Sequence, residues 1–218
     1  MYLLVTATEL EMAPLRARLA SCAGVEFLVA GVGMLETAVH LGQFLARRPG
    51  EVAAVVNLGV AGAFVGTGAA LLDLCLAERE VLGDFGICAN GTITSFSGDT
   101  MATDTVFPLD DSLRARAEAG LVAHGFGVRR GTFVTVNCVS GTERRGAMLR
   151  DRHQALCENM EGAAVTRLCR LHAIPALELR AVSNLVEDRD PSRWRLAEAV
   201  DLCAEAAGVL IPHLTGRP

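Results

Sequence analysis

Short apolar runs alternate with longer amphipathic stretches along the whole chain. The runs are bounded by turn residues, a pattern that predicts buried β-strands at residues 2–6, 25–30, 52–57, 71–81, 133–139 and 176–182. The longer stretches predict helices at residues 10–20, 34–47, 110–124, 158–174 and 191–210. The glycine-rich segment 58–64 and most of segment 83–108 are predicted to be turns and loops.

Strands that alternate with helices predict one α/β domain over residues 1–218. We expect three layers, α-β-α, around a central twisted sheet that is mixed and largely parallel, with helices on both faces. Ligands of such folds bind at the carboxyl ends of the strands. Functional side chains are therefore expected directly after each strand.

Composition narrows the class of protein. Hydrophobic residues make up 51% of the 218 residues, and the net charge of -5 argues against nucleic acid as a partner. Seven scattered cysteines without a C-x-x-C spacing predict free thiols in a reducing cytoplasm rather than disulfides or a metal site. No apolar run approaches the roughly 20 residues of a membrane span. We expect a soluble cytoplasmic protein without a membrane segment.

Polar side chains follow the first and the last predicted strand. Thr8 and Glu11 come after residues 2–6, where the simpler role of a glutamate is to lie beside the positive end of a helix dipole. Arg180, Ser183 and Asn184 end or follow residues 176–182, where the simpler interpretation is a plain turn. The spacing of these residues alone does not decide between these simpler roles and a role in a functional site.

Glycines mark two further junctions. Gly31 and Gly33 open a helix as in a dinucleotide-binding loop, but Glu36 occupies the position of the third glycine, so no nicotinamide or flavin cofactor is predicted. Gly59 and Gly62 permit a ligand to approach the backbone closely, or serve only a tight turn.

The stretch CENMEGAAV, residues 157–165, places Glu158 and Glu161 at the start of a predicted buried helix. Carboxylates are rarely buried without partners, so this pair requires an explanation.

Four motifs together resemble the nucleoside phosphorylase and nucleosidase superfamily. They are ATELEM (7–12), NLGVAGAF (57–64), ENMEGAA (158–164) and RAVSN (180–184), and they occur in that family's order. The form MEGAA, together with SNLVEDRDPSRW, resembles the futalosine hydrolase branch, whose members cleave the base from futalosine in menaquinone synthesis. Val60 and Glu187 depart from the family's patterns, where serine and glycine are expected.

The resemblance implies a role for each motif. Glu11 matches the catalytic glutamate and would act as the general base for water, with Arg180 orienting the base or the water. Met160 and Glu161 match the pair that binds the ribose, where an ionised carboxylate can accept hydrogen bonds from both sugar hydroxyls. The remaining implied contacts with substrate are Thr8 and Ser183, Gly62 in the loop near the sugar, and Cys138 and Val139 as an apolar floor for the base.

Asn184 replaces the aspartate of the methylthioadenosine enzymes, and this bears on the base. A leaving 6-oxopurine presents a protonated N7 beside the acceptor O6, and an asparagine amide offers one acceptor and one donor to that pair. An ionised aspartate would face O6 with a second acceptor. Asn184 therefore predicts hypoxanthine, the base of futalosine, rather than adenine.

Several points stay open at this stage. The alternatives are another purine nucleosidase, which would act on methylthioadenosine, adenosylhomocysteine or aminodeoxyfutalosine, a purine nucleoside phosphorylase, or a non-catalytic nucleoside-binding protein. Arg129, Arg144 and Arg145 are equal candidates for the anionic benzoate of futalosine. Glu158 is interpreted as a partner of the helix dipole. The resemblance also implies a homodimer or a larger homo-oligomer.

Overall fold

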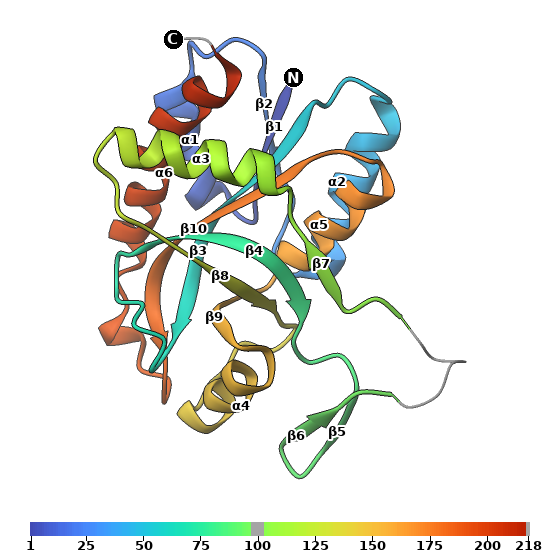
Figure 1. Cartoon of the computed structure of the whole chain (residues 1–218), viewed down its shortest axis with the longest axis vertical. Coiled ribbons are helices and arrows are strands. Elements are labelled where there is room, and N and C mark those ends of the chain that lie inside the picture. Colours follow the sequence, from blue (N-terminus) through green and yellow to red (C-terminus); the bar gives the residue numbers. More distant parts are fainter. Residues whose placement is uncertain (97–102, 217–218) are drawn as a thin grey trace.

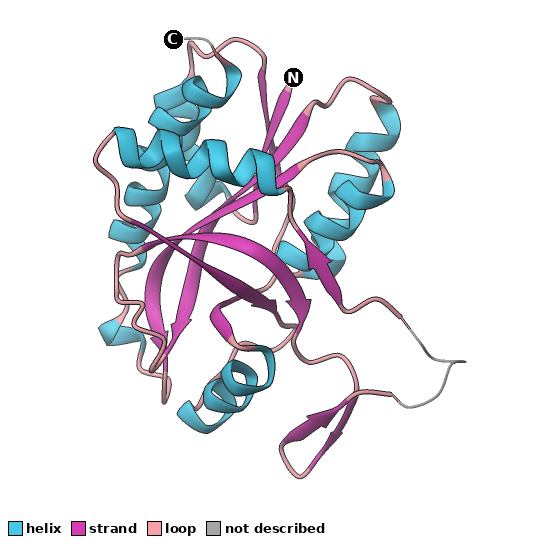
Figure 2. Cartoon of the chain, viewed as in Figure 1, coloured by secondary structure: helices cyan, strands magenta, loops and turns pink. Residues whose placement is uncertain are grey.

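Strands and helices alternate along the chain in the computed structural model, which describes residues 1–96 and 103–216 (Figures 1 and 2). The elements are β1 (Tyr2–Thr6), α1 (Glu9–Leu19), β2 (Val25–Val29), α2 (Met34–Arg47), β3 (Ala54–Phe64), β4 (Leu74–Leu82), β5 (Ile87–Ala89), β6 (Thr92–Thr94), β7 (Val106–Pro108), α3 (Asp111–Ala123), β8 (Val128–Thr135), α4 (Glu143–His153), β9 (Ala155–Asn159), α5 (Gly162–Leu171), β10 (Ala176–Val186), a 3-10 turn (Pro191–Arg193) and α6 (Leu196–Thr215).

The described residues form one large mixed sheet. Its strands follow the order β10-β4-β8-β9-β3-β1-β2, and β7 pairs with β4. Because β10 also pairs with β3, the strands β3, β9, β8, β4 and β10 close into a ring. Five of the pairings are parallel and three are antiparallel. The predicted α/β fold with a mixed, largely parallel sheet is confirmed.

Alternating residues of the strands separate two cores. Leu4 packs with α1, α3 and α6, whereas its neighbours Leu3 and Val5 pack with α2 and α5. Figure 1 shows these two groups of helices on opposite sides of β1 and β3. Sheet strands buried on both faces explain why their sequences are apolar runs rather than alternating patterns.

The glycine-rich segment 58–64 was predicted to be a loop. In the structure it is instead the second half of the long strand β3. Likewise β10 does not end at residue 182 but continues to Val186, so that Asn184 lies opposite Gly62 across a β-bulge. Pairing inside the closed ring satisfies the backbone groups of these residues, and this outweighs the low strand propensity of glycine.

Two further element predictions are wrong. The predicted helix 158–174 is divided between strand β9 and helix α5, so Glu158 lies in a strand and not in a helical turn. The strand predicted at 133–139 ends at Thr135. The described residues of segment 83–108 are mostly turns and loops, as predicted, and include the short strands β5, β6 and β7, while residues 97–102 lie outside the described part.

Candidate active site

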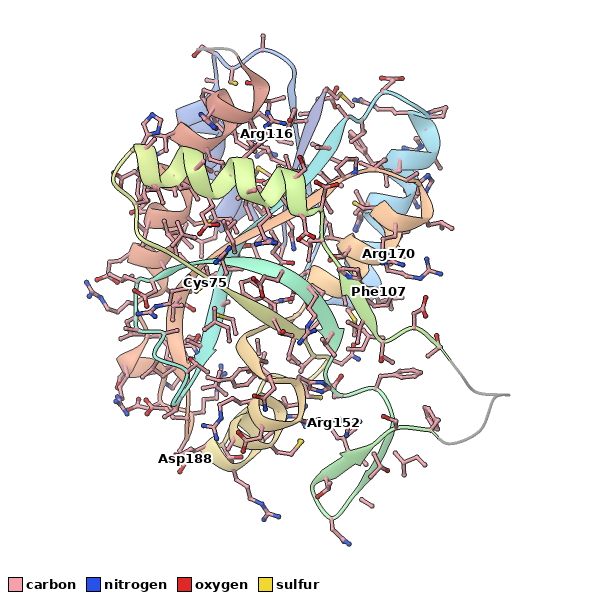
Figure 3. The ribbon with its side chains drawn as sticks, in the orientation of Figure 1. Cys75, Phe107, Arg116, Arg152, Arg170 and Asp188 are labelled. Atoms are coloured by element: carbon pink, nitrogen blue, oxygen red, sulfur yellow. The ribbon has the colours of Figure 1, made fainter. Side chains whose placement is uncertain are left out.

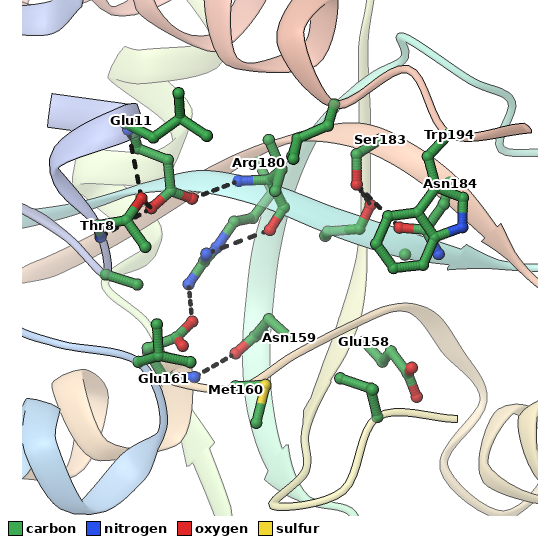
Figure 4. Close-up of a pocket in the computed structure, with 18 of the residues that line it drawn as sticks. Thr8, Glu11, Glu158, Asn159, Met160, Glu161, Arg180, Ser183, Asn184 and Trp194 are labelled. Atoms are coloured by element: carbon green, nitrogen blue, oxygen red, sulfur yellow. Dashed lines mark hydrogen bonds and ion pairs between the residues drawn. The ribbon is translucent and has the colours of Figure 1, made fainter. Parts of the chain in front are cut away.

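A cavity of about 250 Å³ opens where β1 and β9 end and where β3 and β10 lie side by side (Figure 4). The structure brings nine of the ten predicted site residues to its wall: Thr8, Glu11, Gly62, Val139, Met160, Glu161, Arg180, Ser183 and Asn184. These residues come from segments far apart in the sequence. The carboxyl-end location expected for an α/β fold is therefore observed.

Glu11 caps α1 and faces the cavity at the same time. Its Oε2 accepts hydrogen bonds from the backbone N and the Oγ of Thr8, at 3.0 and 2.7 Å, while the Thr8 Oγ accepts from the Glu11 N. This capping box fixes the side chain. The other oxygen, Oε1, accepts from the backbone N of Val60 at 3.2 Å. Capping and placement in the cavity are thus combined in one carboxylate, which is 8% exposed.

Glycine at position 59 permits a close approach behind Glu11. A Cβ there would lie 2.5 Å from the Glu11 Oε1 and 2.8 Å from the Arg180 Nη1. Any side chain at this position would push apart the two charged groups that face each other across the strand.

Side chains cover the sheet and the helices on either side of it (Figure 3). Among them, Arg180 is buried and is held by groups on three sides (Figure 4). Its Nε donates to Glu178 Oε1 at 2.9 Å, its Nη2 to Glu161 Oε2 at 3.4 Å, and its Nη1 to the carbonyl of Val60 at 3.3 Å. Burial lowers the pKa of Arg180, but the charges of Glu178, Glu161 and Glu11 outweigh this effect and raise it. The guanidinium therefore stays charged, and its partners keep it in a fixed orientation.

Glu161 lies at the N-terminus of α5 and points into the cavity (Figure 4). Its Oε1 accepts from the backbone N of Gly33 at 3.0 Å, and its Oε2 is the partner of Arg180. Gly33 has φ +88°, a conformation that glycine adopts without strain. The Gly-x-Gly turn excluded as a dinucleotide loop therefore has another task, which is to hold this carboxylate.

Asn184 lies against β3 at the opposite end of the cavity. The Ser183 Oγ donates to its Oδ1 at 2.9 Å, and its Nδ2 donates to the carbonyl of Leu185 at 3.2 Å. A Cβ at Gly62 would lie 3.0 Å from that Nδ2, so the glycine makes room for the amide. One acceptor and one donor are thus fixed side by side at this end of the cavity.

Cys138, the tenth predicted residue, is exposed and does not line the cavity. Beyond the end of β8 at Thr135, Cys138 lies in a bend with its side chain exposed, whereas the next residue, Val139, lines the cavity. Asp84 fixes this turn, since its Oδ2 accepts from the backbone N of Asn137 and of Cys138 at 3.0 and 3.2 Å. The apolar floor predicted from Cys138 and Val139 is therefore reduced to Val139.

Other lining residues escaped the sequence analysis. Glu158 is a buried strand residue whose two oxygens accept from the N and the Oγ of Ser140, at 2.8 and 2.7 Å. Burial raises its pKa. The guanidinium of Arg189 lies 4.5 Å from the centre of the Trp194 ring, and both residues line the cavity. Arg129, Arg144 and Arg145 do not line it.

A sequence model of the phosphorylase superfamily matches residues 6–214. The chain belongs to this superfamily. It is also 36% identical to the futalosine hydrolase of Streptomyces coelicolor, over 88% of this chain and 80% of that protein. It is 34% identical to the futalosine hydrolase of Thermus thermophilus, over 88% and 84% of the two chains. Within the superfamily, the chain therefore belongs with the futalosine hydrolases.

Solved structures of the family share the fold. The native futalosine hydrolase of Helicobacter pylori superposes with a TM-score of 0.82 and 17% identity, over 96% of each chain. A mutant of the Helicobacter pylori 5'-methylthioadenosine/S-adenosylhomocysteine nucleosidase, with 5'-methylthioadenosine in its active site, superposes with a TM-score of 0.84 over 96% of this chain and 97% of that one.

Two further findings concern the described residues only. None of their helices combines the length and the apolar character that crossing a membrane requires. No three of their His, Cys, Asp or Glu side chains are grouped so as to hold a metal ion.

Proposed function

We propose that this protein hydrolyses the N-glycosidic bond of futalosine and releases hypoxanthine. The observation that carries the proposal is the arrangement of Glu11, Glu161 and Asn184 around one cavity, with a carboxylate at two positions and a neutral amide at the third. The named relatives, which are futalosine hydrolases, support the same substrate. The reaction passes through a sugar with oxocarbenium character, so it needs an activated water, a held sugar and a neutral leaving base.

Glu11 is the general base in this proposal. Its carboxylate is held by Thr8 and Val60, and it takes a proton from a water whose oxygen attacks C1′ of the ribose. As the new C–O bond forms, the bond between C1′ and the purine N9 breaks, and N7 of the base takes a proton from solvent water. Glu11 then returns the proton that it took to solvent, so hypoxanthine leaves as a neutral base. Arg180 keeps the surroundings of Glu11 in place, since Gly59 brings the two groups close together.

Glu161 receives the ribose hydroxyls. Each of its oxygens already accepts one hydrogen bond, from Gly33 or from Arg180, and each has a second acceptor position that can serve a sugar hydroxyl. Its negative charge also stabilises the cation that develops on the sugar. Met160 lines the same part of the wall and packs on the sugar.

Asn184 selects the base. Its Oδ1 accepts a hydrogen bond from the protonated N7 and its Nδ2 donates one to O6, the complementary pair of a 6-oxopurine. Val139 and Trp194 supply apolar surface around the base.

Arg189 is the partner that we assign to the substrate's carboxylate. Besides Arg180 it is the only arginine on the cavity wall, and it makes no ion pair within the described part of the chain. By contrast Arg129 is paired with Asp73 and Arg145 with Asp84.

A phosphorylase is less well supported by the geometry. Phosphate would need cationic or amide donors beside the sugar, but the guanidinium donors of Arg180 are directed to Glu178, Glu161 and Val60. Two carboxylates would also repel the anion. A non-catalytic binding protein would not require the held base Glu11.

The biological setting is also a proposal. Cleavage of futalosine would place the protein in menaquinone synthesis. All seven cysteines are free, in accord with a reducing cytoplasm. The exposed Leu35 and Val39 of α2, 75% and 45% exposed, support a homo-oligomer, which light scattering would test.

The test is incubation of the purified protein with futalosine, inosine and methylthioadenosine, each with and without phosphate. We expect free hypoxanthine from futalosine, at a rate that does not depend on phosphate. Preferred cleavage of methylthioadenosine, or turnover only with phosphate, would contradict the proposal.

A further inference from the structure

Two carboxyl groups meet in the interior of the strand ring, next to the cavity. Glu80 of β4 is 0% exposed and Glu178 of β10 is 1% exposed. Neither lines the cavity, and the proposed reaction does not use them directly. Thr135 of β8 and Asn159 of β9 complete the group, so four strands of the ring each contribute a polar side chain.

The acceptors and donors of this group can be counted. The Thr135 Oγ and the Asn159 Nδ2 donate to the two oxygens of Glu80, at 2.7 and 2.6 Å. The Oε1 of Glu178 accepts from the Asn57 Nδ2 at 3.1 Å and from the Arg180 Nε at 2.9 Å. Its Oε2 has no donor among the described residues. A buried carboxylate oxygen without a donor costs free energy, so a proton is missing from the count.

Glycine at position 162 shows which group faces that oxygen. A Cβ on Gly162 would lie 2.1 Å from the Glu80 Oε1 and 2.5 Å from the Glu178 Oε2. The two carboxyl groups therefore share the small space that this glycine leaves open.

The charges around this group also indicate that one of its carboxyl groups carries a proton. Glu11, Glu161 and Glu178 surround Arg180, the one cation in contact with this group among the described residues. An ionised Glu80 would add a fourth buried carboxylate. Burial, and then the charge of Glu178, raise the pKa of Glu80 well above its usual 4.5, and the neighbouring thiols Cys75 and Cys157 bring no compensating positive charge.

We propose that Glu80 is a neutral carboxylic acid that donates its proton in a hydrogen bond to Oε2 of Glu178, and that it acts as a positioning residue for the active site. Through Glu178 it holds Arg180. Through the Asn159 Nδ2 it orients the amide of Asn159, whose Oδ1 accepts from the backbone N of Glu161 and Gly162 at 3.0 and 2.8 Å. That turn presents Glu161 to the cavity.

The protonation of Glu80 stands without the proposed reaction, whereas its positioning role rests on that proposed function. Two measurements separate them. The first is infrared spectroscopy of the wild-type protein at about pH 7, where exposed carboxyl groups are ionised. We expect the carbonyl stretch of a protonated acid, which Glu80→Gln removes and the exposed control Glu205→Gln retains. A wild-type spectrum without a band that Glu80→Gln removes would overturn the protonation.

Stability provides a second readout of the same proton. Because the folded protein holds the Glu80 proton more tightly than the unfolded chain, wild-type stability falls relative to Glu80→Gln as the pH rises above 4.5, through the folded-state pKa. If the melting temperatures of wild type and Glu80→Gln depend on pH in the same way, the protonation of Glu80 is contradicted.

The positioning role is tested by the pH profile of kcat/KM for futalosine. The Glu80→Gln variant is neutral at this position and keeps a donor toward Glu178, and Thr135 can turn to the Asn159 Oδ1, 3.2 Å away. We expect Glu80→Gln to stay within about tenfold of wild type and to resist the alkaline loss of activity that wild type shows when Glu80 ionises. Glu80→Leu should lose more, because it leaves Glu178 and Asn159 without their partner.

The outcomes are distinguishable. If wild type does not hydrolyse futalosine, the proposed function fails, while the infrared and melting data still decide the protonation. If wild type hydrolyses futalosine but its alkaline limb coincides with that of Glu80→Gln, the positioning role is contradicted.

Discussion

Replacement of Asn184 by aspartate should change which purine is released. The Asn184 Nδ2 lies at the end of the cavity, where it is fixed by the carbonyl of Leu185 at 3.2 Å and by the space over Gly62. Asn184→Asp exchanges this donor for an acceptor that faces O6 of hypoxanthine. The charge that it adds suits the amino group of adenine instead.

The size of the effect follows from the one substrate contact that is lost. An unpaired acceptor in a desolvated site costs about 1–3 kcal/mol, which corresponds to a loss of roughly 5- to 150-fold in kcat/KM for futalosine. The compatible contact with a 6-aminopurine should raise kcat/KM for aminodeoxyfutalosine. The ratio of the two kcat/KM values should therefore change by more than either value alone.

The assay is kcat/KM for futalosine and for aminodeoxyfutalosine, with Asn90→Asp in an exposed turn as the matched change of charge. Because the carboxylate would also face the carbonyl of Leu185, the melting temperature of each variant is measured alongside. If Asn184→Asp keeps the wild-type preference between the two bases, the assignment of Asn184 to base selection is refuted.

Three further changes test other parts of the account. Gly162→Ala should lower the free energy of unfolding by about 1–3 kcal/mol in thermal denaturation, because its Cβ would lie 2.1 Å from a Glu80 oxygen. The control Gly141→Ala has open space around the new Cβ and should keep the wild-type stability. Equal melting temperatures of the two variants would contradict this prediction. Cys138→Ser should leave kcat/KM unchanged, because Cys138 lies outside the cavity, and a clear loss would restore it as a site residue. Arg189→Ala should raise KM for futalosine but not for inosine, which lacks the carboxylate; equal changes for both would remove Arg189 from that role.

The sequence predicted the residues that follow strands better than it predicted where the strands end. Thr8, Glu11 and Arg180 were candidates because each accompanies a clear apolar run and lies in a motif that resembles the family, and the structure brings them to one cavity. Strand β9 was missed because its apolar residues run directly into those of α5, and short apolar runs do not distinguish a strand from a helix. Because of that error, Glu158 was interpreted as a partner of a helix dipole, whereas its carboxylate accepts a hydrogen bond from Ser140.

Contacts made by closure of the strand ring were beyond the sequence. Glu178 and Arg180 share a face of β10 as residues two apart, which their spacing could have indicated. Glu80, however, lies far earlier in the chain than Glu178, and the two carboxyl groups meet only because β4 pairs with β10. From the sequence, Gly59 and Gly62 suggested only a loop. Their actual role is to leave room for the side chains of Glu11 and Asn184, and the sequence could not show this because those side chains come from other elements.

The most direct test of the account is the rate of hypoxanthine release from futalosine in phosphate-free buffer, measured for wild type and Glu11→Gln together. Glutamine keeps the shape of the side chain but cannot take the proton of water, so kcat should fall by about 10²- to 10⁴-fold while futalosine still binds. Unchanged turnover in Glu11→Gln, or no hypoxanthine from the wild-type protein, would contradict the central claim.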